Sequence, residues 1–196
     1  MSAAISRGFS LIELVFVAAL IGIVSAVAIP GVLADVDDSR AIGATRYLSA
    51  RLHRARMEAV ARSADVALKF TALNGGYSYE EYVDGNGNGV RSMDIARGVD
   101  RSIHPAERLR DQFPGVDFGV RTGLPPVEPG GAPPGTDPVR LGAADMVTFT
   151  PSGTSSTGSL YILGRSGAQY VIRIFGESGK TRVLKFNPRT RQWKPL

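Results

Sequence analysis

The sequence has no cysteine, only two histidines and a single tryptophan among its 196 residues. Without cysteine, a disulfide framework, a thiolate zinc site and a cysteine nucleophile are all excluded. The two histidines, His53 and His104, are too few for a histidine-rich metal site and form no recognisable Ser/His/Asp arrangement. No other pattern of catalytic residues stands out, so the sequence predicts a protein that is not an enzyme.

Also lacking is a second long apolar run. Leu11–Ile29 is a stretch of 19 residues in which Glu13 is the only ionisable side chain, and nothing similar recurs. The remaining composition is ordinary, with 43% hydrophobic and 21% charged residues and a formal charge of +5. These values exclude a collagen, a disordered acidic tail and a membrane protein with several spans. The length allows one domain or two small ones.

The apolar run has the length of a membrane-spanning helix, which needs roughly 20 apolar residues to cross roughly 30 Å of hydrocarbon. A buried core helix fits less well, because it is seldom apolar around its whole circumference in a chain this small. A secretory signal fits less well because no convincing cleavage site follows Pro30-Gly31. Arg7 precedes the run and the first charges after it are acidic. The positive-inside tendency therefore places the N-terminus in the cytoplasm and the remainder outside.

Glu13 is the third residue of this run, close to its cytoplasmic end, and a carboxylate in such a segment costs roughly 2–3 kcal/mol on insertion scales. Taken alone, it is either a functional residue or a side chain that reaches the interface. The surrounding residues, Arg7-Gly8-Phe9-Ser10-Leu11-Ile12-Glu13-Leu14-Val15, closely resemble the prepilin-type cleavage and methylation motif. This motif belongs to type IV pilins and type II secretion pseudopilins.

The resemblance implies a division of the chain and a processing pathway. Residues 1–8 would be a leader peptide, 9–30 a transmembrane and filament-core helix, and 31–196 a periplasmic head with the second half of the long helix. A prepilin peptidase/methyltransferase would cut between Gly8 and Phe9 and methylate the amine of Phe9. Glu13 would pair with the N-terminal ammonium of a neighbouring subunit, which neutralises its charge and sets its depth in the filament.

Helical periodicity returns after Pro30-Gly31, where a kink or a short break is expected. The apolar stripe consists of Ala41, Thr45, Leu48, Leu52, Ala55 and Ala59. We expect one long helix from Phe9 to about Ser63, with its second half packed on a sheet. Six arginines lie between Arg40 and Arg62 against one acid, Glu58. They form either a solvated helix face or a surface that meets an acidic groove of a partner.

Period-two alternation follows the helix and predicts a mainly antiparallel β-sheet head, so that the fold class is α+β and pilin-like. A hairpin is expected around Asn74-Gly75-Gly76, and Leu124–Pro138 is expected to be a surface loop because strands lie on both sides of it. The predicted strands are Val66–Phe70, Tyr77–Val83, Val116–Val120, Met146–Thr150, Ser159–Leu163, Tyr170–Phe175 and Thr181–Phe186.

Two segments of the head are similar to the GspH/FimT/FimU group of minor pilins. They are Leu48–Arg62 with the strand after it, and Val147–Gly153 with the later strand–Gly–strand hairpin. The resemblance implies a minor pseudopilin of the inner membrane, which assembles with other minor and major pseudopilins into a type II secretion pseudopilus. The alternative is a minor pilin of a type IV pilus or competence system that binds DNA for uptake. Residues 84–138 match nothing in the group.

The segment Asp84–Asp94 is the first of two candidate ligand sites. Asp84, Asn86 and Asn88 carry oxygen atoms at positions 1, 3 and 5 of an EF-hand-like loop, and Gly89 at position 6 permits the sharp turn. The last acid of the segment, Asp94, falls at position 11, whereas an EF-hand loop has its carboxylate at position 12. This segment is either a weak calcium site, the one cofactor considered, or an Asn/Gly-rich hairpin turn. The candidate calcium ligands are Asp84, Asn86, Asn88 and Asp94.

The C-terminal stretch from Arg165 to Lys194 holds eight basic residues against one acid, Glu177, with aromatic residues interleaved. Basic and aromatic groups together suit nucleic-acid binding, and Gly179–Arg182 resembles a basic hairpin element of DNA-binding competence pilins. The other interpretation is a set of strand residues that face water. The candidate DNA contacts are Lys180, Arg182, Lys185, Arg189 and Arg191.

Overall fold

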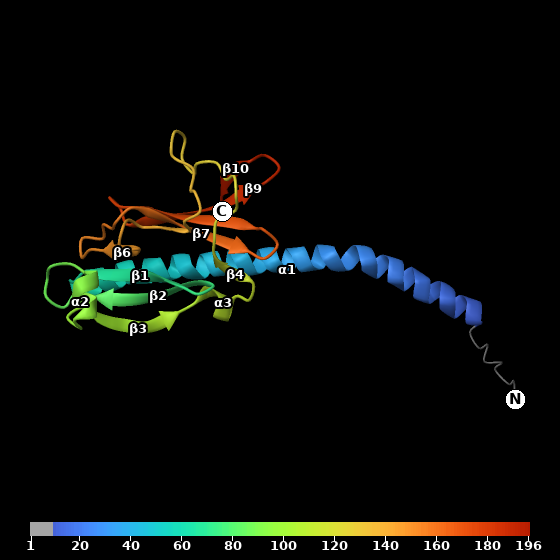
Figure 1. Cartoon of the computed structure of the whole chain (residues 1–196), viewed down its shortest axis with the longest axis horizontal. Coiled ribbons are helices and arrows are strands. Elements are labelled where there is room, and N and C mark those ends of the chain that lie inside the picture. Colours follow the sequence, from blue (N-terminus) through green and yellow to red (C-terminus); the bar gives the residue numbers. More distant parts are fainter. Residues whose placement is uncertain (1–9) are drawn as a thin grey trace, which may run out of the picture. The chain divides into compact units, whose positions relative to one another are not determined.

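The computed structural model describes residues 10–196 and divides them into two compact units, residues 10–36 and Asp37–Leu196. One helix, α1 (Leu11–Arg62), contributes to both units (Figure 1). This confirms the predicted long helix. Of the kink or short break expected at Pro30-Gly31, the break is not found: the backbone is helical at both residues. A proline within a helix lacks one backbone hydrogen-bond donor, and the backbone is helical on both sides of Pro30.

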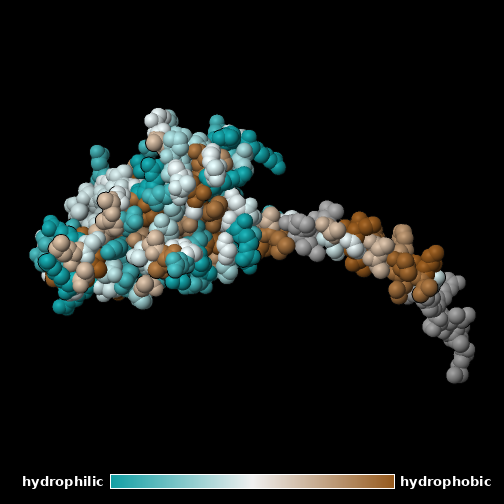
Figure 2. Space-filling view, viewed as in Figure 1, coloured by the Kyte–Doolittle hydropathy of each residue, from teal (hydrophilic) through white to brown (hydrophobic). Residues whose placement is uncertain are grey.

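The first unit consists of the apolar part of α1. All the side chains from Leu11 to Val24 are exposed in the isolated chain, and Figure 2 shows this segment in the colour of hydrophobic residues. Among the residues that the structure describes, α1 is the one helix long and apolar enough to cross a membrane by length and composition. The observation agrees with single-pass anchoring.

The second unit, which we call the head, contains the rest of α1 and two antiparallel sheets. The four-stranded sheet has the order β3-β2-β1-β6, and the six-stranded sheet has the order β10-β9-β8-β7-β4 with β5 paired to β7. The strands of the first sheet are β1 (Val66–Leu73), β2 (Gly76–Val83), β3 (Arg101–Glu107) and β6 (Met146–Phe149). Those of the second are β4 (Val116–Phe118), β5 (Val139–Arg140), β7 (Gly158–Gly164), β8 (Gln169–Phe175), β9 (Lys180–Asn187) and β10 (Gln192–Pro195).

The main core lies where the second half of α1 meets both sheets, and Figure 1 shows the ribbon of α1 running between them. All six residues of the predicted stripe have no exposed surface, which confirms the helix face assigned from periodicity. The small side chains of the stripe permit a close approach to the strands. A Cβ added at Gly164 on β7 would lie 3.1 Å from the Cβ of Ala41, so the helix and the strand leave no room for a larger residue there.

A smaller cluster lies on the opposite face of the six-stranded sheet, away from α1. It contains Leu124, Tyr161, Val171, Leu184 and Phe186, with Trp193 packed against it. The predicted loop Leu124–Pro138 covers this cluster, and the indole N–H of Trp193 donates a hydrogen bond to the carbonyl oxygen of Pro125 at 3.1 Å. The loop is therefore on the surface, as expected, but its first residue is part of a core.

The seven predicted strands are all found, and five short elements were not predicted. The additional strands are β3, β5 and β10, and the additional helices are α2 (Ser92–Ala96) and α3 (Leu109–Gln112). α2, α3 and β3 lie in the segment after Val83, for which the sequence offered no assignment.

Candidate functional site

The candidate assembly segment is the start of α1. Glu13 lies in the first turn of this helix, and its side chain is exposed. The neighbours Leu11, Ile12 and Leu14 are exposed as well, at 82%, 77% and 62%, so the carboxylate stands in an apolar surface. Gly8 and Phe9, the predicted cleavage and methylation residues, lie outside the residues that the structure describes.

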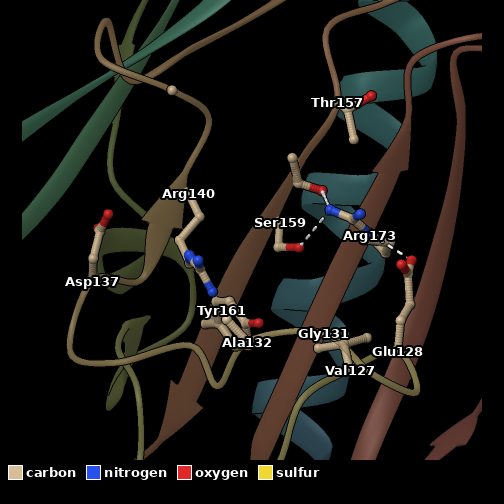
Figure 3. A pocket seen from close by; sticks show the side chains of 12 residues that line it. Val127, Glu128, Gly131, Ala132, Asp137, Arg140, Thr157, Ser159, Tyr161 and Arg173 are labelled. Atoms are coloured by element: carbon tan, nitrogen blue, oxygen red, sulfur yellow. Dashed lines mark hydrogen bonds and ion pairs between the residues drawn. The ribbon is translucent and has the colours of Figure 1, made fainter.

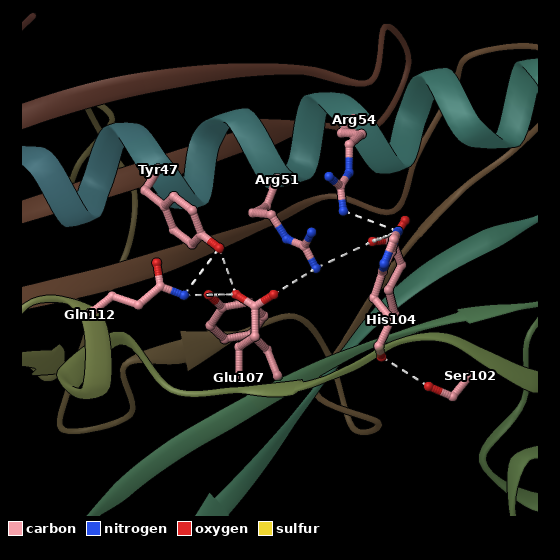
Figure 4. A network of polar contacts seen from close by, with 9 residues as sticks. Tyr47, Arg51, Arg54, Ser102, His104, Glu107 and Gln112 are labelled. Atoms are coloured by element: carbon pink, nitrogen blue, oxygen red, sulfur yellow. Dashed lines mark hydrogen bonds and ion pairs between the residues drawn. The ribbon is translucent and has the colours of Figure 1, made fainter.

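A network of polar side chains joins the second half of α1 to β2 and β3 (Figure 4). Its centre is Glu107, whose Oε2 accepts hydrogen bonds from the hydroxyl groups of Tyr47 at 2.7 Å and Tyr79 at 3.0 Å. The guanidinium of Arg51 lies 3.2 Å from the other carboxylate oxygen of Glu107 and 3.7 Å from Oε2 of Glu81. Arg51 therefore lies between two carboxylates at the surface where the helix packs on the sheet.

The pKa values of the two carboxyl groups in this network are shifted in opposite directions. Burial opposes ionisation of Glu107, but hydrogen bonds from Tyr47 and the charge of Arg51 hold the pKa of Glu107 below its ordinary value. Burial raises the pKa of Glu81, and the nearby His104 and Arg51 only partly offset it. Within residues 10–196, neither carboxylate oxygen of Glu81 makes a hydrogen bond. In the part of the chain that the structure describes, Glu81 is therefore a buried carboxyl group without hydrogen bonds, whereas Glu107 accepts several.

A second polar site is a groove of about 520 Å³ on the outer face of the six-stranded sheet (Figure 3). Arg140, Ser159 and Arg173 line it from β5, β7 and β8, and Glu128 and Val127 line it from the covering loop. Arg173 Nε donates a hydrogen bond to Glu128 Oε1 at 2.9 Å, and Arg173 Nη1 donates to Ser159 Oγ at 3.2 Å. The polar side chains that line the groove are those of two arginines, two acids and three hydroxyl residues: Arg140, Arg173, Glu128, Asp137, Thr157, Ser159 and Tyr161.

A family model described as type II transport protein GspH matches residues 44–179, which is more than two-thirds of the chain. The chain belongs to the GspH family. It is therefore, at the family level, a minor pseudopilin of type II secretion, and GspH pseudopilins are structural subunits. No curated protein and no solved structure matches the chain.

The GspH match begins within the packed half of α1 and ends at Gly179, before β9. The matched region includes the residues of the polar network and all those that line the groove. The N-terminal motif with Glu13 precedes the match. The long helix followed by antiparallel sheets is the α+β, pilin-like architecture expected from the sequence.

In this GspH head, the candidate calcium segment forms a turn that is closed by its own side chains. The Asp84 carboxylate accepts three hydrogen bonds from backbone N–H groups of the turn, at 2.8 to 3.0 Å. Burial of the Asp84 carboxyl group opposes its ionisation, but the backbone hydrogen bonds outweigh this effect and lower the pKa of Asp84. The amide of Asn88 donates to Asp94 Oδ2 at 3.2 Å. Within residues 10–196 no group of three or more acidic or histidine side chains is placed to hold a metal ion, and calcium binding stays a prediction.

The five candidate DNA contacts do not lie together. The ammonium of Lys185 lies 2.7 Å from Asp38 Oδ2 and 5.5 Å from the centre of the Tyr170 ring, on the side of the sheet that faces α1. Arg182 lies opposite Arg173 of β8 and is exposed. Because successive residues of a strand point to opposite faces, Lys185 and Arg182 are on different faces of β9.

The other three candidates lie at the two ends of β9. Lys180 is exposed at its beginning, and Arg189 is exposed in the turn before β10. Arg191 donates a hydrogen bond from Nη2 to the carbonyl oxygen of Gly123 at 3.1 Å, which ties the turn to the covering loop. DNA binding by these residues stays a prediction.

Arg51, Glu81 and Glu107 were not identified as site residues from the sequence. A signal was available for one of them. Tyr79, Glu81 and Val83 alternate along β2, and Tyr79 is buried, so period two places a carboxylate on the buried face. A buried carboxylate requires a cation nearby, but nothing local identifies Arg51 on the helix as that cation.

Proposed function

We propose that the chain is a minor pseudopilin subunit, without enzymatic activity of its own, that assembles into a type II secretion pseudopilus. The single observation that carries the proposal is the GspH match over residues 44–179 in a chain that also has an apolar helix of membrane-spanning length. In this proposal residues 1–8 are a leader, residues 9–30 are the membrane and filament-core helix, and residues 31–196 are the periplasmic head. Its partners are other minor and major pseudopilins.

Processing is the first step of the proposed pathway. The short basic leader ends at Gly8, and a prepilin peptidase on the cytoplasmic side would cut between Gly8 and Phe9 and methylate the new amine of Phe9. The subunit would then remain in the inner membrane through α1, with its N-terminus in the cytoplasm.

Glu13 would act in the second step, the entry into the filament. A carboxylate among apolar side chains is stabilised when a positive group neutralises it, and the N-terminal ammonium of an adjacent subunit is such a group. The pair can form only at one relative depth of two helices. Glu13 would therefore set the register of the subunit in the filament core.

Processing is tested by expressing the full chain with a prepilin peptidase/methyltransferase and measuring its intact mass. We expect the mass of residues 9–196 with one added methyl group, and an uncleaved chain for Gly8→Leu. Gly22→Leu is the matched control, because nothing lies within 4 Å of a Cβ added at Gly22, and it should be cleaved normally. A wild-type chain that keeps residues 1–8 beside active peptidase would contradict the proposal.

Assembly is tested by co-purification of the full chain with other pseudopilins from a host with an intact type II secretion system. Glu13→Leu should be inserted and cleaved as usual but recovered with much less partner, whereas Asp35→Asn, which also removes one acid from α1, should retain its partners. Undiminished recovery of partners with Glu13→Leu would refute the registry role of Glu13. Recovery of the wild type without any other pseudopilin would refute assembly itself.

A further inference from the structure

Strand pairing on the six-stranded sheet aligns four polar residues that are far apart in the sequence. Arg140 of β5 is paired with Ser159 of β7, Ser159 with Arg173 of β8, and Arg173 with Arg182 of β9. Neighbouring strands lie roughly 4.8 Å apart, so these four residues form a row across the sheet that is roughly 14 Å long. We call it the arginine row.

The arginine row lies on the outer face of the sheet. Tyr161, Val171 and Leu184, two positions along the same strands, belong to the cluster on the face away from α1, and residues two apart in a strand share a face. Their neighbours Leu160 and Ile172 belong to the main core. The arginine row is therefore a polar strip beside the outer apolar cluster, on the same face of the sheet. Three of its residues, Arg140, Ser159 and Arg173, line the groove of Figure 3.

The charge of the row is only partly neutralised by the head itself. Arg173 forms an ion pair with Glu128 at 2.9 Å. The other acid of the groove, Asp137, accepts the backbone N–H of Val139 at 3.0 Å. Among residues 10–196, neither Arg140 nor Arg182 makes an ion pair. Arg173 and Arg182 are directly opposite each other, an arrangement that destabilises a sheet when both are charged.

Hydroxyl groups complete the site next to the arginines. Ser159 and Tyr161 are only 6% and 2% exposed, yet both line the groove. Burial raises the pKa of the Tyr161 hydroxyl, although Arg140 partly opposes this, so the hydroxyl keeps its proton and can donate it in a hydrogen bond. Cations and neutral donors on one wall are the groups that bind a carboxylate.

We propose that the arginine row binds an acidic segment of a partner polypeptide, with a carboxylate held between Arg140 and the hydroxyl groups and a second one at Arg182. The head already shows the type of contact, because the loop residue Glu128 places a carboxylate on Arg173. A nucleic acid suits the row less well. The aromatic ring that lines the groove, Tyr161, is only 2% exposed and is therefore too buried to stack on a base.

The test uses the full chain in non-ionic detergent micelles and measures fluorescence anisotropy of a labelled hexaglutamate peptide at low salt. We expect saturable binding that weakens as salt is raised, and a loss of affinity of about tenfold for each charged hydrogen bond removed in Arg140→Gln/Arg182→Gln. Both side chains are exposed, so circular dichroism should show an unchanged fold.

Arg189→Gln is the matched control, since it removes one exposed arginine that is outside the row, and it should keep wild-type affinity. A hexaglutamine peptide should not bind. Equal loss of affinity in Arg189→Gln, equal binding of hexaglutamine, or no binding at all would overturn the proposal. So would binding of a short DNA duplex that depends on Arg140 and Arg182 while hexaglutamate is ignored.

The inference rests on the proposed function only in taking the partner to be a polypeptide of the secretion system. Its outcome is separable from that function. A chain that is processed at Gly8 and co-purifies with pseudopilins but ignores hexaglutamate would overturn the arginine row alone, and a chain that binds the peptide but is never processed would overturn the function alone.

Discussion

The two halves of α1 differ in what surrounds them, although they share one helix. From Leu11 to Val24 every side chain is exposed in the isolated chain, and apolar residues occupy all sides of the helix, with Glu13 as the one ionisable residue. From Ala41 to Ala59 only one stripe is apolar, and that stripe has no exposed surface. The first half exposes its hydrophobic surface, while the second half buries it against its own chain.

The two halves also treat an ionisable residue differently. Glu13 is the one acid in the apolar half and is exposed. Arg51 is 8% exposed and has two carboxylates of the same chain beside it. A charge in an apolar environment needs a partner of opposite charge. In the head the chain supplies the partner, whereas we propose that a second subunit supplies it for Glu13.

The largest expected effect concerns the charge buried in the head. Arg51→Met keeps a similar volume but leaves Glu81 and Glu107 without their shared cation, and removing one partner of a buried ion pair costs about 3 to 5 kcal/mol. Arg46→Met, on the exposed face of the same helix, should change the free energy of unfolding by less than about 0.5 kcal/mol. Urea unfolding followed by Trp193 fluorescence measures both. Equal values for the two variants would mean that the network does not stabilise the head.

The second-largest effect is expected when an apolar residue is truncated in the packed half of α1, with truncation in the exposed half as the comparison. Leu48→Ala opens a cavity in the main core, where Leu48 is fully buried, and should lower the free energy of unfolding by about 3 kcal/mol. Leu20→Ala, at a residue that is 52% exposed in the isolated chain, should leave unfolding of the head unchanged within about 0.5 kcal/mol. Urea unfolding in detergent measures both variants. A comparable loss from Leu20→Ala would break the contrast between the halves.

A smaller effect is a dependence on pH. Because burial raises the pKa of Glu81, the folded head holds this proton more tightly than the unfolded chain does. Glu81 therefore contributes stability below its unfolded pKa, and this contribution is lost as the pH rises through its folded pKa. Gln resembles the protonated form, so Glu81→Gln should match wild type at pH 4 and be more stable at pH 8.

The measurement is urea unfolding of both proteins across this pH range. The lowered pKa of Glu107 acts in the opposite direction, but it is present in both proteins and largely cancels in the difference. A Glu81→Gln head that loses stability at pH 8 would show instead that the carboxylate is stabilised by Arg51 more than it is destabilised by burial.

The smallest effect is expected at the start of the packed half of α1. Lys185 and Asp38 form an ion pair in which both side chains are more than a third exposed, at 39% and 38%. Such pairs contribute little, so Lys185→Met should reduce the free energy of unfolding by about 0.5 kcal/mol. The loss should disappear at high salt, because screening removes the attraction in wild type as well. A loss that persists at high salt would indicate that the contact of the ammonium with the Tyr170 ring contributes as well.

Most of the head could be predicted because its strongest signals are local. The helical stripe and the seven predicted strands depend on periodicities of 3.6 and 2 within short segments, and each was found. β3 was not predicted because Arg101–Glu107 contains Pro105 and has no fully buried residue, so it lacks the apolar alternation of a strand. β5 and β10 have two and four residues, too few to show a period.

The candidate sites were harder to predict, because they depend on pairing between distant segments. The sequence identified the basic C-terminal residues as a group, but successive residues of β9 point to opposite faces of the sheet. Lys185 therefore pairs with Asp38, whereas Arg182 lies on the outer face. The segment at Asp84 was expected to be either a calcium site or a turn, and the hydrogen bonds of the turn follow from Asx-turn chemistry that the sequence already suggests.

The amino-acid sequence by itself determined the membrane-length helix, the lone Glu13 within it, the motif at Gly8 and Phe9, and the helical stripe of the head. Each is a pattern that neighbouring residues carry on their own. Only the tertiary structure decided that Arg51 lies between Glu81 and Glu107 and that Arg140, Arg173 and Arg182 form one row. Those contacts join residues that are 30 or more positions apart or on separate strands, and strand register and helix packing, which no local period encodes, bring them together.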